Sequence, residues 1–400
     1  MRMIATILVA VALAAVASAS LHIETVFEIP LPARGSIEFA LDAIDGDRYY
    51  TVAKNGLSVI AVSLSTKSVQ WWKNISTNSF DNIQGLVAAD GIVLIGTIGK
   101  THAYSFATGD KLWENTRTIQ PTATYRSMGS KMYLLEGGKK YSGGYIVYNL
   151  TSGAILHREN VGAGDFSGDN LYLSTGMAKT LKAVNWKTNT TLWMTPGSIY
   201  SFLDVSTKYV VTTNHTSAGD TILNVYDAMD GHVVQKFEAM NGINLNAICT
   251  LQGDYIFAEV GEIDGRFVYL DILNGYQLWA RSAPSEGGSA YVVTSSGIAQ
   301  ITQQLQLNLI NISTGEPSLT VNGVPSSSNP SITDFGSGIV KVSNLQGYTI
   351  WDTATGHYLG RDERAPSSSQ SGTVSSKPKM FGDIFVTTNG ATVIGQKLAQ

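Results

Sequence analysis

The 400-residue chain has few of the residues that cross-link a fold or bind polyanions. Cys249 is its single cysteine, so no intramolecular disulfide can form. Charged residues make up 14% of the chain, the formal net charge is −4, and the 27 Lys and Arg residues are scattered along the sequence. Because no basic stripe is present, we expect no nucleic-acid partner.

Long apolar runs are also scarce. The N-terminal run from Ile4 to Val16 follows Met1 and Arg2 and ends in the small residues 17–19. It is shorter than the ~20 residues of a membrane-spanning helix, and its features are typical of a secretory signal. We therefore expect residues 1–20 to be a cleaved signal peptide, with a retained anchor as the alternative. Residues 21–400 then form one domain without a transmembrane segment, in the ER lumen or outside the cell.

The reactive side chains show no catalytic pattern. Cys249 lies in an apolar strand-like segment, which predicts a buried and inert thiol. The spacing of the histidines gives no zinc pair, and Gly162 and Gly164 lack the strand–turn–helix context of a nucleotide loop. We expect solvated histidines rather than metal ligands at four positions, His102, His215, His232 and His357.

One short pattern occurs eight times between residues 63 and 360: an apolar strand, a short polar residue, a turn usually closed by Gly, and often Leu-Trp. Clear copies are SFATGDKLW at 105–113 and DILNGYQLW at 271–279. The turn residues recur at intervals of 36 to 44 residues, at Lys67, Gly109, Gly153, Asn189, Gly231, Gly275, Gly315 and Gly356. Gly or Asn suits a left-handed backbone there, and Lys67 is the poor fit.

Two positions are fixed relative to each turn residue. Four residues before it stands a short polar side chain that can accept hydrogen bonds from the turn, in order Ser63, Ser105, Asn149, Asn185, Asp227, Asp271, Asn311 and Asp352. Four residues after it stands Trp71, Trp113, Trp193 or Trp279, replaced elsewhere by His157, Gln235, Leu319 and Gly360. A period near 42 without helical signals predicts an all-β, closed β-propeller of four-stranded blades.

The pattern leaves the number of blades open. After the eighth turn, a further strand pair spans residues 383–388 and 391–395, and residues 23–29 could add the missing strand. Pairing the two ends of the chain would close the ring and remove exposed sheet edges. Literal counting gives nine units. Acidic glycine turns such as Asp45-Gly46-Asp47 and Asp90-Gly91 predict hairpins within the units rather than calcium loops.

The tandem unit resembles the pyrroloquinoline quinone (PQQ)-type repeat of the quinoprotein alcohol dehydrogenase-like propellers. The resemblance implies that the four Trp residues dock each blade on its neighbour. It also favours eight blades, the usual number in this family, and we keep nine as the alternative. Enzymes of the family hold PQQ between a Trp floor and, in many members, a disulfide of adjacent cysteines, with a calcium site. This chain has one cysteine and no acidic cluster that stands out beside a unique Trp.

Five Asn-x-Ser/Thr sequons are the candidate modification sites: Asn74, Asn149, Asn189, Asn214 and Asn311. Behind a signal peptide, they favour a eukaryotic secretory protein. Because three of them lie in the repeated turn, glycans at Asn149, Asn189 and Asn311 would share one face of the disc.

The segment AKNGLSVIAV at 53–62, with Trp71 and the unit ending Leu112-Trp113-Glu114, also resembles the lumenal propeller of the subunit 1 family of the ER membrane protein complex. That family continues beyond its propeller into a membrane helix. Together these features predict a non-catalytic protein-interaction scaffold with no cofactor or metal and a protein partner, such as subunits of that membrane complex. The alternatives are a PQQ-dependent dehydrogenase and a secreted propeller that binds a ligand or glycan.

Overall fold

The structure is a computed structural model. It describes residues 22–32, 42–52, 58–75, 83, 85–97, 99–116, 124–136, 143–175, 180–195, 201–215, 221–238, 249–260, 266–282, 290–294, 297–302, 306–322, 331–336, 338–344, 347–353, 355–356, 358–362, 379–388 and 392–399. The expected signal peptide at 1–20 and His357 lie outside these residues.

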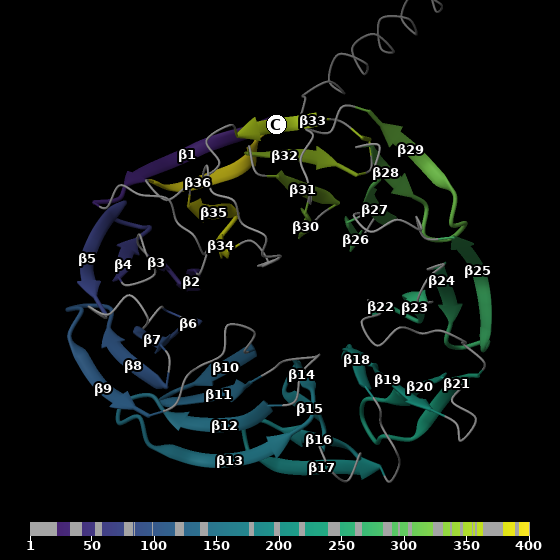
Figure 1. Cartoon of the computed structure of the whole chain (residues 1–400), viewed down its shortest axis with the longest axis horizontal. Coiled ribbons are helices and arrows are strands. Elements are labelled where there is room, and N and C mark those ends of the chain that lie inside the picture. The colour runs from purple at the N-terminus through teal and green to yellow at the C-terminus, as the bar shows by residue number, and fades with distance from the viewer. Residues whose placement is uncertain are drawn as a thin grey trace, which may run out of the picture.

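The described residues form β-strands and turns, with no helix, and the strands make nine four-stranded antiparallel sheets arranged as the blades of a ring (Figure 1). Blade 1 comprises β2 (Asp42–Asp45), β3 (Arg48–Val52), β4 (Ser58–Ser63) and β5 (Ser68–Asn74), blade 2 comprises β6 (Gly85–Ala89), β7 (Ile92–Thr97), β8 (Lys100–Ser105) and β9 (Lys111–Asn115), and blade 3 comprises β10 (Thr124–Met128), β11 (Lys131–Leu135), β12 (Gly143–Asn149) and β13 (Ile155–Val161).

Blades 4 to 6 follow in chain order. Blade 4 comprises β14 (Gly164–Ser167), β15 (Asn170–Ser174), β16 (Leu181–Asn185) and β17 (Thr190–Thr195), blade 5 comprises β18 (Ser201–Val205), β19 (Tyr209–His215), β20 (Thr221–Asp227) and β21 (Val233–Phe237), and blade 6 comprises β22 (Cys249–Gln252), β23 (Tyr255–Val260), β24 (Arg266–Asp271) and β25 (Tyr276–Ser282).

The last three blades include the closure of the ring. Blade 7 comprises β26 (Ala290–Thr294), β27 (Gly297–Ile301), β28 (Leu307–Ile310) and β29 (Pro317–Val321), blade 8 comprises β30 (Ser331–Gly336), β31 (Ile339–Asn344), β32 (Gly347–Asp352) and β33 (Tyr358–Asp362), and blade 9 comprises β34 (Lys379–Phe381), β35 (Ile384–Thr388), β36 (Thr392–Ala399) and β1 (His22–Pro30).

The N-terminal strand β1 is therefore the outer strand of the last blade. It pairs antiparallel with β36 from His22 opposite Ala399 to Pro30 opposite Thr392. This confirms the closure predicted from the two chain ends. The blade count is nine, the alternative that literal counting left open, rather than the family-typical eight that we favoured, because β34–β36 and β1 complete a separate blade.

The core lies between the blades rather than within one of them. Each described cluster of buried apolar side chains joins two neighbouring blades, a contact that we call a seam; one cluster packs Tyr50 and Trp71 of blade 1 against Val93 and Ile95 of blade 2. Cys249 is buried in the seam between blades 5 and 6, as expected.

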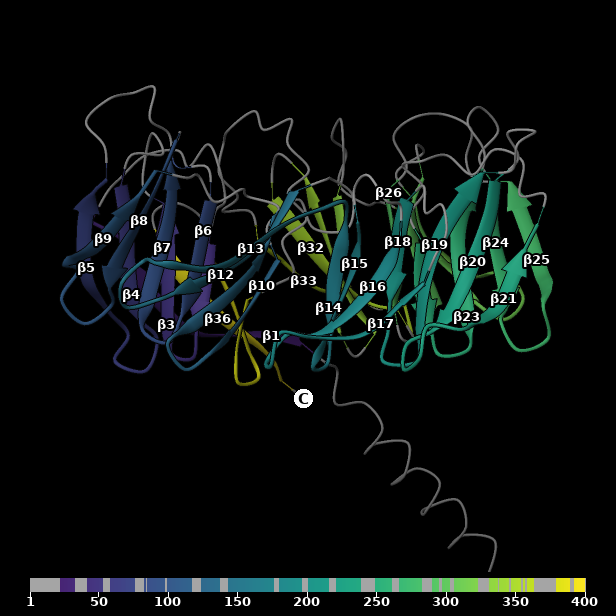
Figure 2. The ribbon, with the colours of Figure 1, turned by 90° about the horizontal axis from the view of Figure 1, so that it is seen from below.

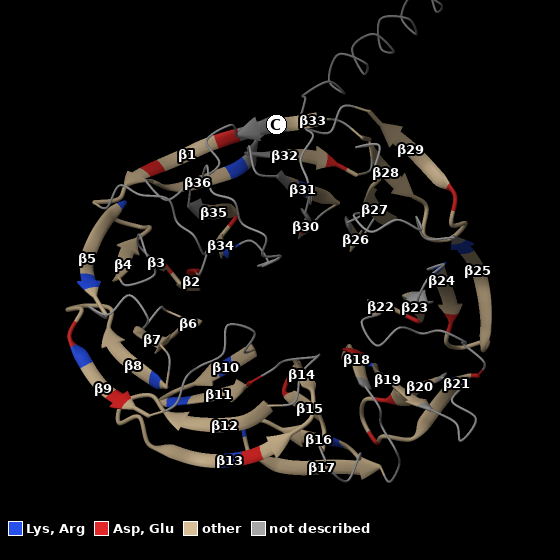
Figure 3. Ribbon diagram, in the orientation of Figure 1, with Lys and Arg blue, Asp and Glu red and all other residues tan. Residues whose placement is uncertain are grey.

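The ring has two edges with different connections. In blades 1 to 8, the tight turn between the first two strands and the turn before the outer strand lie on the same edge, because consecutive strands are antiparallel (Figure 2). We call this the turn edge. The acidic glycine turns form hairpins there, with positive φ at Gly46, Gly91, Gly168, Gly253 and Gly382. Lys, Arg, Asp and Glu residues are scattered over the blades (Figure 3).

Candidate functional site

The repeated turn before each outer strand has one backbone conformation in all eight copies. Its turn residue has positive φ throughout, including +52° at Lys67 and +57° at Asn189. In six of the copies, the glycine N–H donates to the carbonyl four residues earlier, as from Gly153 to Asn149 at 2.8 Å. Lys67 adopts the same left-handed backbone as the glycines despite its side chain.

The short polar side chains cap these turns. Asn149 Oδ1 accepts from the backbone of Thr151 and Ser152, both at 3.0 Å. Asp227 Oδ1 accepts from Met229 N at 2.7 Å, and Asp271 Oδ1 accepts from Asn274 N at 3.0 Å. At Asp352, the Thr355 hydroxyl donates to Oδ2 at 2.9 Å. Asx turns of this kind satisfy backbone donors that a tight turn leaves free.

The four Trp residues lie in the seams, each on the turn of the next blade. In every case the indole N–H donates to the carbonyl three residues before the next turn glycine: Trp71 to Phe106 at 2.5 Å, Trp113 to Leu150 at 2.6 Å, Trp193 to Ala228 at 3.0 Å and Trp279 to Ile312 at 2.7 Å.

The indole rings also lie directly against the next turn glycine. A Cβ on that glycine would be 2.9 Å or less from the ring at Gly109, Gly153, Gly231 and Gly315. These glycines are therefore required twice, once for their positive φ and once for the space that the Trp fills.

A β-bulge aims each docking side chain. In all eight outer strands that follow a turn, the third residue after the turn residue is the extra, unpaired one, and the docking residue comes next. In blade 2, for example, Ala103 pairs with Trp113 and Tyr104 pairs with Lys111, so Leu112 is the extra residue. The extra residue twists the strand and re-orients the next side chain toward the neighbouring blade. The sequence pattern did not reveal this bulge.

Where Trp is absent, smaller side chains occupy the same place. Gln235 and Leu319 contact the next turn glycines, Gly275 and Gly356, so closely that a Cβ there would be 2.1 Å and 1.8 Å away. The docking position thus tolerates a change of chemistry as long as the turn residue of the next blade is covered.

Phe27 is a docking residue that the sequence pattern missed. In β1 the register slips between Thr25 and Phe27, as in the other outer strands, and Phe27 is buried against Gly395. Its ring lies 5.9 Å from Nζ of Lys67, the turn residue of blade 1. Phe27 therefore closes the seam between blades 9 and 1. The turn that marks the other copies is missing because this outer strand is the first strand of the chain.

Carboxylates on the innermost strands hold neighbouring blades together. Asp45 Oδ2 on β2 accepts from Gly91 N of blade 2 at 2.7 Å, and Asp204 Oδ2 on β18 accepts from Leu251 N of blade 6 at 2.8 Å. Asp42 accepts from the Tyr49 hydroxyl at 3.0 Å and lies 3.9 Å from Lys379 Nζ of blade 9. Burial raises the pKa of Asp42 above its usual range.

The five sequon asparagines lie at both edges of the ring. Asn149, Asn189 and Asn311 are in turns on the turn edge, and Asn311 Oδ1 accepts from Ser313 N at 2.9 Å. Asn74 ends β5 and Asn214 lies near the end of β19, both toward the opposite edge. The Ser58 hydroxyl donates to Asn74 Oδ1 at 2.5 Å.

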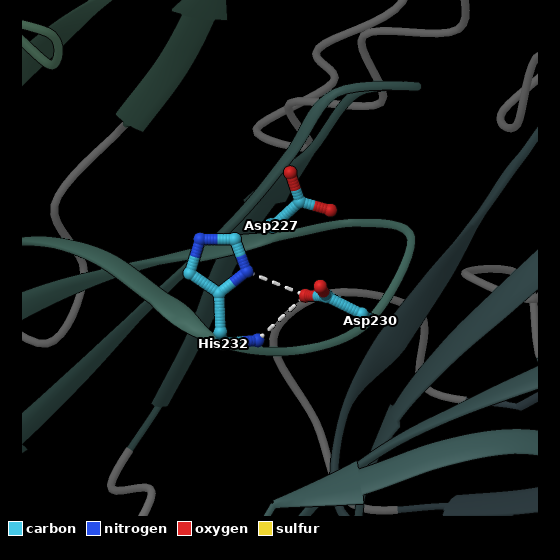
Figure 4. Close-up of side chains that lie close together, drawn as sticks. All are labelled: Asp227, Asp230 and His232. Carbon is cyan, nitrogen blue, oxygen red and sulfur yellow. Dashed lines mark hydrogen bonds and ion pairs between the residues drawn. The ribbon is translucent and has the colours of Figure 1, made fainter.

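One group of side chains in the described residues has donor atoms close enough to hold a metal ion. The donor atoms of Asp227, Asp230 and His232 lie within 4.8 Å of one another at the turn of blade 5 (Figure 4). Asp230 Oδ1 lies 2.6 Å from His232 Nδ1 and accepts from His232 N at 3.0 Å.

These contacts describe a stabilised turn. The hydrogen bond with Asp230 raises the pKa of His232, and hydrogen bonds from His232 lower the pKa of Asp230. Asp230 and His232 are exposed, and Asp227 is engaged with Met229 N. His232 is exposed, as expected of a solvated histidine. The expectation for His102 was wrong: His102 is buried, and its Nδ1 lies 3.3 Å from Glu114.

These features define a class of protein, the closed β-propeller built from PQQ-type repeats with docked seams. Residues 33–237, more than half of the chain, match the sequence family PQQ_2, described as outer membrane protein assembly factor BamB. The chain belongs to this family. No curated protein sequence matches it.

Solved structures of low sequence identity are similar to this chain. The computationally designed Ika8 protein is 17% identical, with 79% of this chain and 96% of that chain covered and a TM-score of 0.51. BamB from Moraxella catarrhalis is 15% identical, with 94% and 99% covered and a TM-score of 0.47. Quinohemoprotein alcohol dehydrogenase from Comamonas testosteroni is 12% identical, with 94% and 76% covered and a TM-score of 0.47.

Proposed function

We propose that this chain is a non-catalytic scaffold of the secretory pathway that binds a protein partner on the outer rim of the ring. The observation that carries the proposal is where large apolar side chains are exposed. Most of them lie on outer strands: Trp72, Leu112, Ile155, Leu156, Leu192, Met194, Val233, Tyr276, Leu278 and Tyr358. Exposed apolar groups that gather on one surface are typical of protein-binding sites.

The rim of blades 3 and 4 is the densest part of this surface. Leu156 on β13 and Leu192 on β17 are 50% and 47% exposed, with Ile155 and Met194 beside them in the same strands. The outer strands also have one unpaired edge each, which can hydrogen-bond to an extended segment of a partner. The apolar side chains would contribute affinity, and hydrogen bonds to the strand edge would fix the orientation of the partner segment.

The inner strands favour a structural role over catalysis. Asp42, Asp45 and Asp204 are engaged with groups of their own or the neighbouring blade. A carboxylate already committed to a backbone N–H of the next blade, as in Asp45 and Asp204, is poorly suited to act as a base or a calcium ligand. We accordingly expect no PQQ-dependent turnover.

The direct test is affinity purification of a tagged chain from its native secretory pathway in mild detergent, with quantitative mass spectrometry. We expect the Leu156→Ser/Leu192→Ser double variant to lose the partner, whereas Leu278→Ser on the rim of blade 6 retains it. Subunits of an ER membrane complex among the partners would support the resemblance to that family. Equal recovery with the double variant would overturn the rim as the binding surface.

Two further measurements address compartment and catalysis. If the chain passes through the ER, removal of N-glycans should increase its electrophoretic mobility, and an unchanged mobility in native material would contradict the sequon prediction. Titration with PQQ and Ca²⁺ followed by a dye-linked dehydrogenase assay should give no turnover. Saturable turnover would replace the scaffold with the dehydrogenase alternative.

A further inference from the structure

The seam between blades 4 and 5 contains a cavity of about 620 Å³ that opens to solvent. Its wall includes Thr195 from β17, Asn224 from β20, Lys236 from β21, and the turn residues Asp230 and His232. This volume lies within the roughly 300–1,000 Å³ of small-molecule sites. The docking of Trp193 on the turn of blade 5 does not require such a space.

The repeat explains how the cavity arises. In the preceding seam, Lys182 stands seven residues before its turn residue and Glu159 stands six residues after that of blade 3. Lys182 Nζ lies 3.1 and 3.0 Å from the two Glu159 oxygens. The equivalent residues of the next seam are Asn224 and Thr195, whose shorter side chains leave open the space that the ion pair fills.

Asn224 is the observation that points to a ligand. It is 6% exposed and lines the cavity, yet its carboxamide makes no hydrogen bond with any residue that the structure describes. Polar residues at the same repeat position have partners elsewhere: His102 with Glu114, and Asn308, which accepts from Thr320 at 2.9 Å. An amide that faces a cavity without a protein partner is available to water or to a ligand.

The polar groups on the cavity wall indicate the class of ligand. Lys236 pairs in register with Asn224 across β20 and β21 and forms no ion pair within the described part of the chain. The ammonium and the carboxamide N–H groups can bind a carboxylate. Asn224 Oδ1, the Thr195 hydroxyl and Asp230 can accept from hydroxyl groups, and Met194 and Val233 add apolar wall.

We propose that the cavity between blades 4 and 5 binds a small hydroxylated carboxylate of the sugar-acid class, with Lys236 and Asn224 holding the carboxylate. The cavity shares Met194 and Val233 with the exposed rim but includes neither Leu156 nor Leu192, so the tests of the two proposals change different residues. Its failure would therefore leave the scaffold function untouched, and a failed partner-binding test would leave this site untouched.

The test is calorimetric titration of the full chain with glucuronate, with glucose as the neutral match and acetate as the carboxylate without hydroxyls. We expect saturable binding of glucuronate, and binding weaker by about tenfold or more for glucose and acetate. Lys236→Met should weaken glucuronate binding by about tenfold, while Lys131→Met on β11 of blade 3 should not change it.

A second variant uses the repeat as its own control. Thr195→Glu combined with Asn224→Lys transfers the Glu159–Lys182 pair into this seam and fills the cavity, so it should keep the thermal midpoint and abolish binding. The proposal is overturned if wild-type chain gives no saturable response to glucuronate, if glucose binds equally well, or if the double variant binds as the wild type does.

Discussion

At the residue scale, the docking contact links two requirements in neighbouring blades. In the four seams that contain a docked Trp, the outer strand supplies the indole, and the next turn supplies a glycine with positive φ and no Cβ beneath the ring. Gly231 illustrates both, with φ of +76° and a Cβ position 2.5 Å from the Trp193 ring. Substitution at a turn glycine should therefore affect the seam as well as the local backbone.

The first prediction compares two glycines of positive φ. Gly168 has φ of +57° and no atom within 4 Å of a Cβ, so Gly168→Ala should cost only the backbone term, about 1 kcal/mol. Gly231→Ala should cost about 1–3 kcal/mol more, because its methyl group overlaps Trp193. Thermal unfolding of both variants measures the difference. Equal midpoints would show that the Trp193 ring moves aside without cost.

Two adjacent tryptophans provide the second comparison. Trp71 is buried and docked on blade 2, whereas Trp72 is 47% exposed on the same strand. Trp71→Ala should cost about 3–5 kcal/mol, as for other buried aromatic truncations. Trp72→Ala should change the unfolding free energy by less than about 1 kcal/mol. Similar losses for both variants in chemical denaturation would refute the docking role of the position.

The sequence identifies the docked member of this pair, because Trp71 stands four residues after the turn residue as the other three do. It does not reveal that Leu112 and its equivalents form bulges, since a bulge is defined by the pairing register of two strands. His102 shows the opposite failure. Its burial depends on how the strands of blade 2 pack, which the spacing of histidines along the chain does not record.

At the element scale, the closing strand β1 replaces a covalent connection with strand pairing. Its hydrogen bonds to β36 and the burial of Phe27 are what join the two ends of the chain. The sequence predicted this strand from its apolar pattern and from the incomplete last repeat. Phe27 could not be recognised as a docking residue, because that position is counted from the turn residue and no such turn precedes β1.

The third prediction concerns this closing strand. Phe27→Ala should open the seam between blades 9 and 1 locally, because the ring and its contact with Gly395 are lost. Hydrogen exchange should accelerate in β1, β36 and β35, and remain unchanged in blades 4 to 6. Glu24→Ala, an exposed position of the same strand, is the control. Uniform acceleration in all blades would mean that the ring opens as one cooperative unit.

At the scale of the whole molecule, nine blades rather than eight place β34 of the last blade beside β2 of the first. Asp42, Tyr49 and Lys379 meet there, with Asp42 and Lys379 on the innermost strands of the two blades. Asp42 is largely buried, and Lys379 is too distant at 3.9 Å to make a short hydrogen bond with it. Closing the ring thus buries a carboxylate with incomplete compensation.

The fourth prediction concerns how the ionisation of Asp42 changes stability with pH. Burial raises the pKa of Asp42 in the folded state above the ordinary value of 3.8, and Lys379, Tyr49 and Lys341 lower it by less. The folded chain therefore binds this proton at higher pH than the unfolded chain does, so ionised Asp42 reduces stability above its folded pKa. That loss disappears as the pH falls below 3.8.

Asp42→Asn should accordingly raise the thermal midpoint at about pH 7, since the amide can still accept from Tyr49, and the gain should vanish near about pH 3.5. Asp383→Asn, which removes the same charge from the exposed turn between β34 and β35, should give no comparable gain. A lower midpoint for Asp42→Asn at about pH 7 would show that attraction to Lys379 outweighs burial. The ionised carboxylate would then stabilise the contact between blades 1 and 9 through its attraction to Lys379.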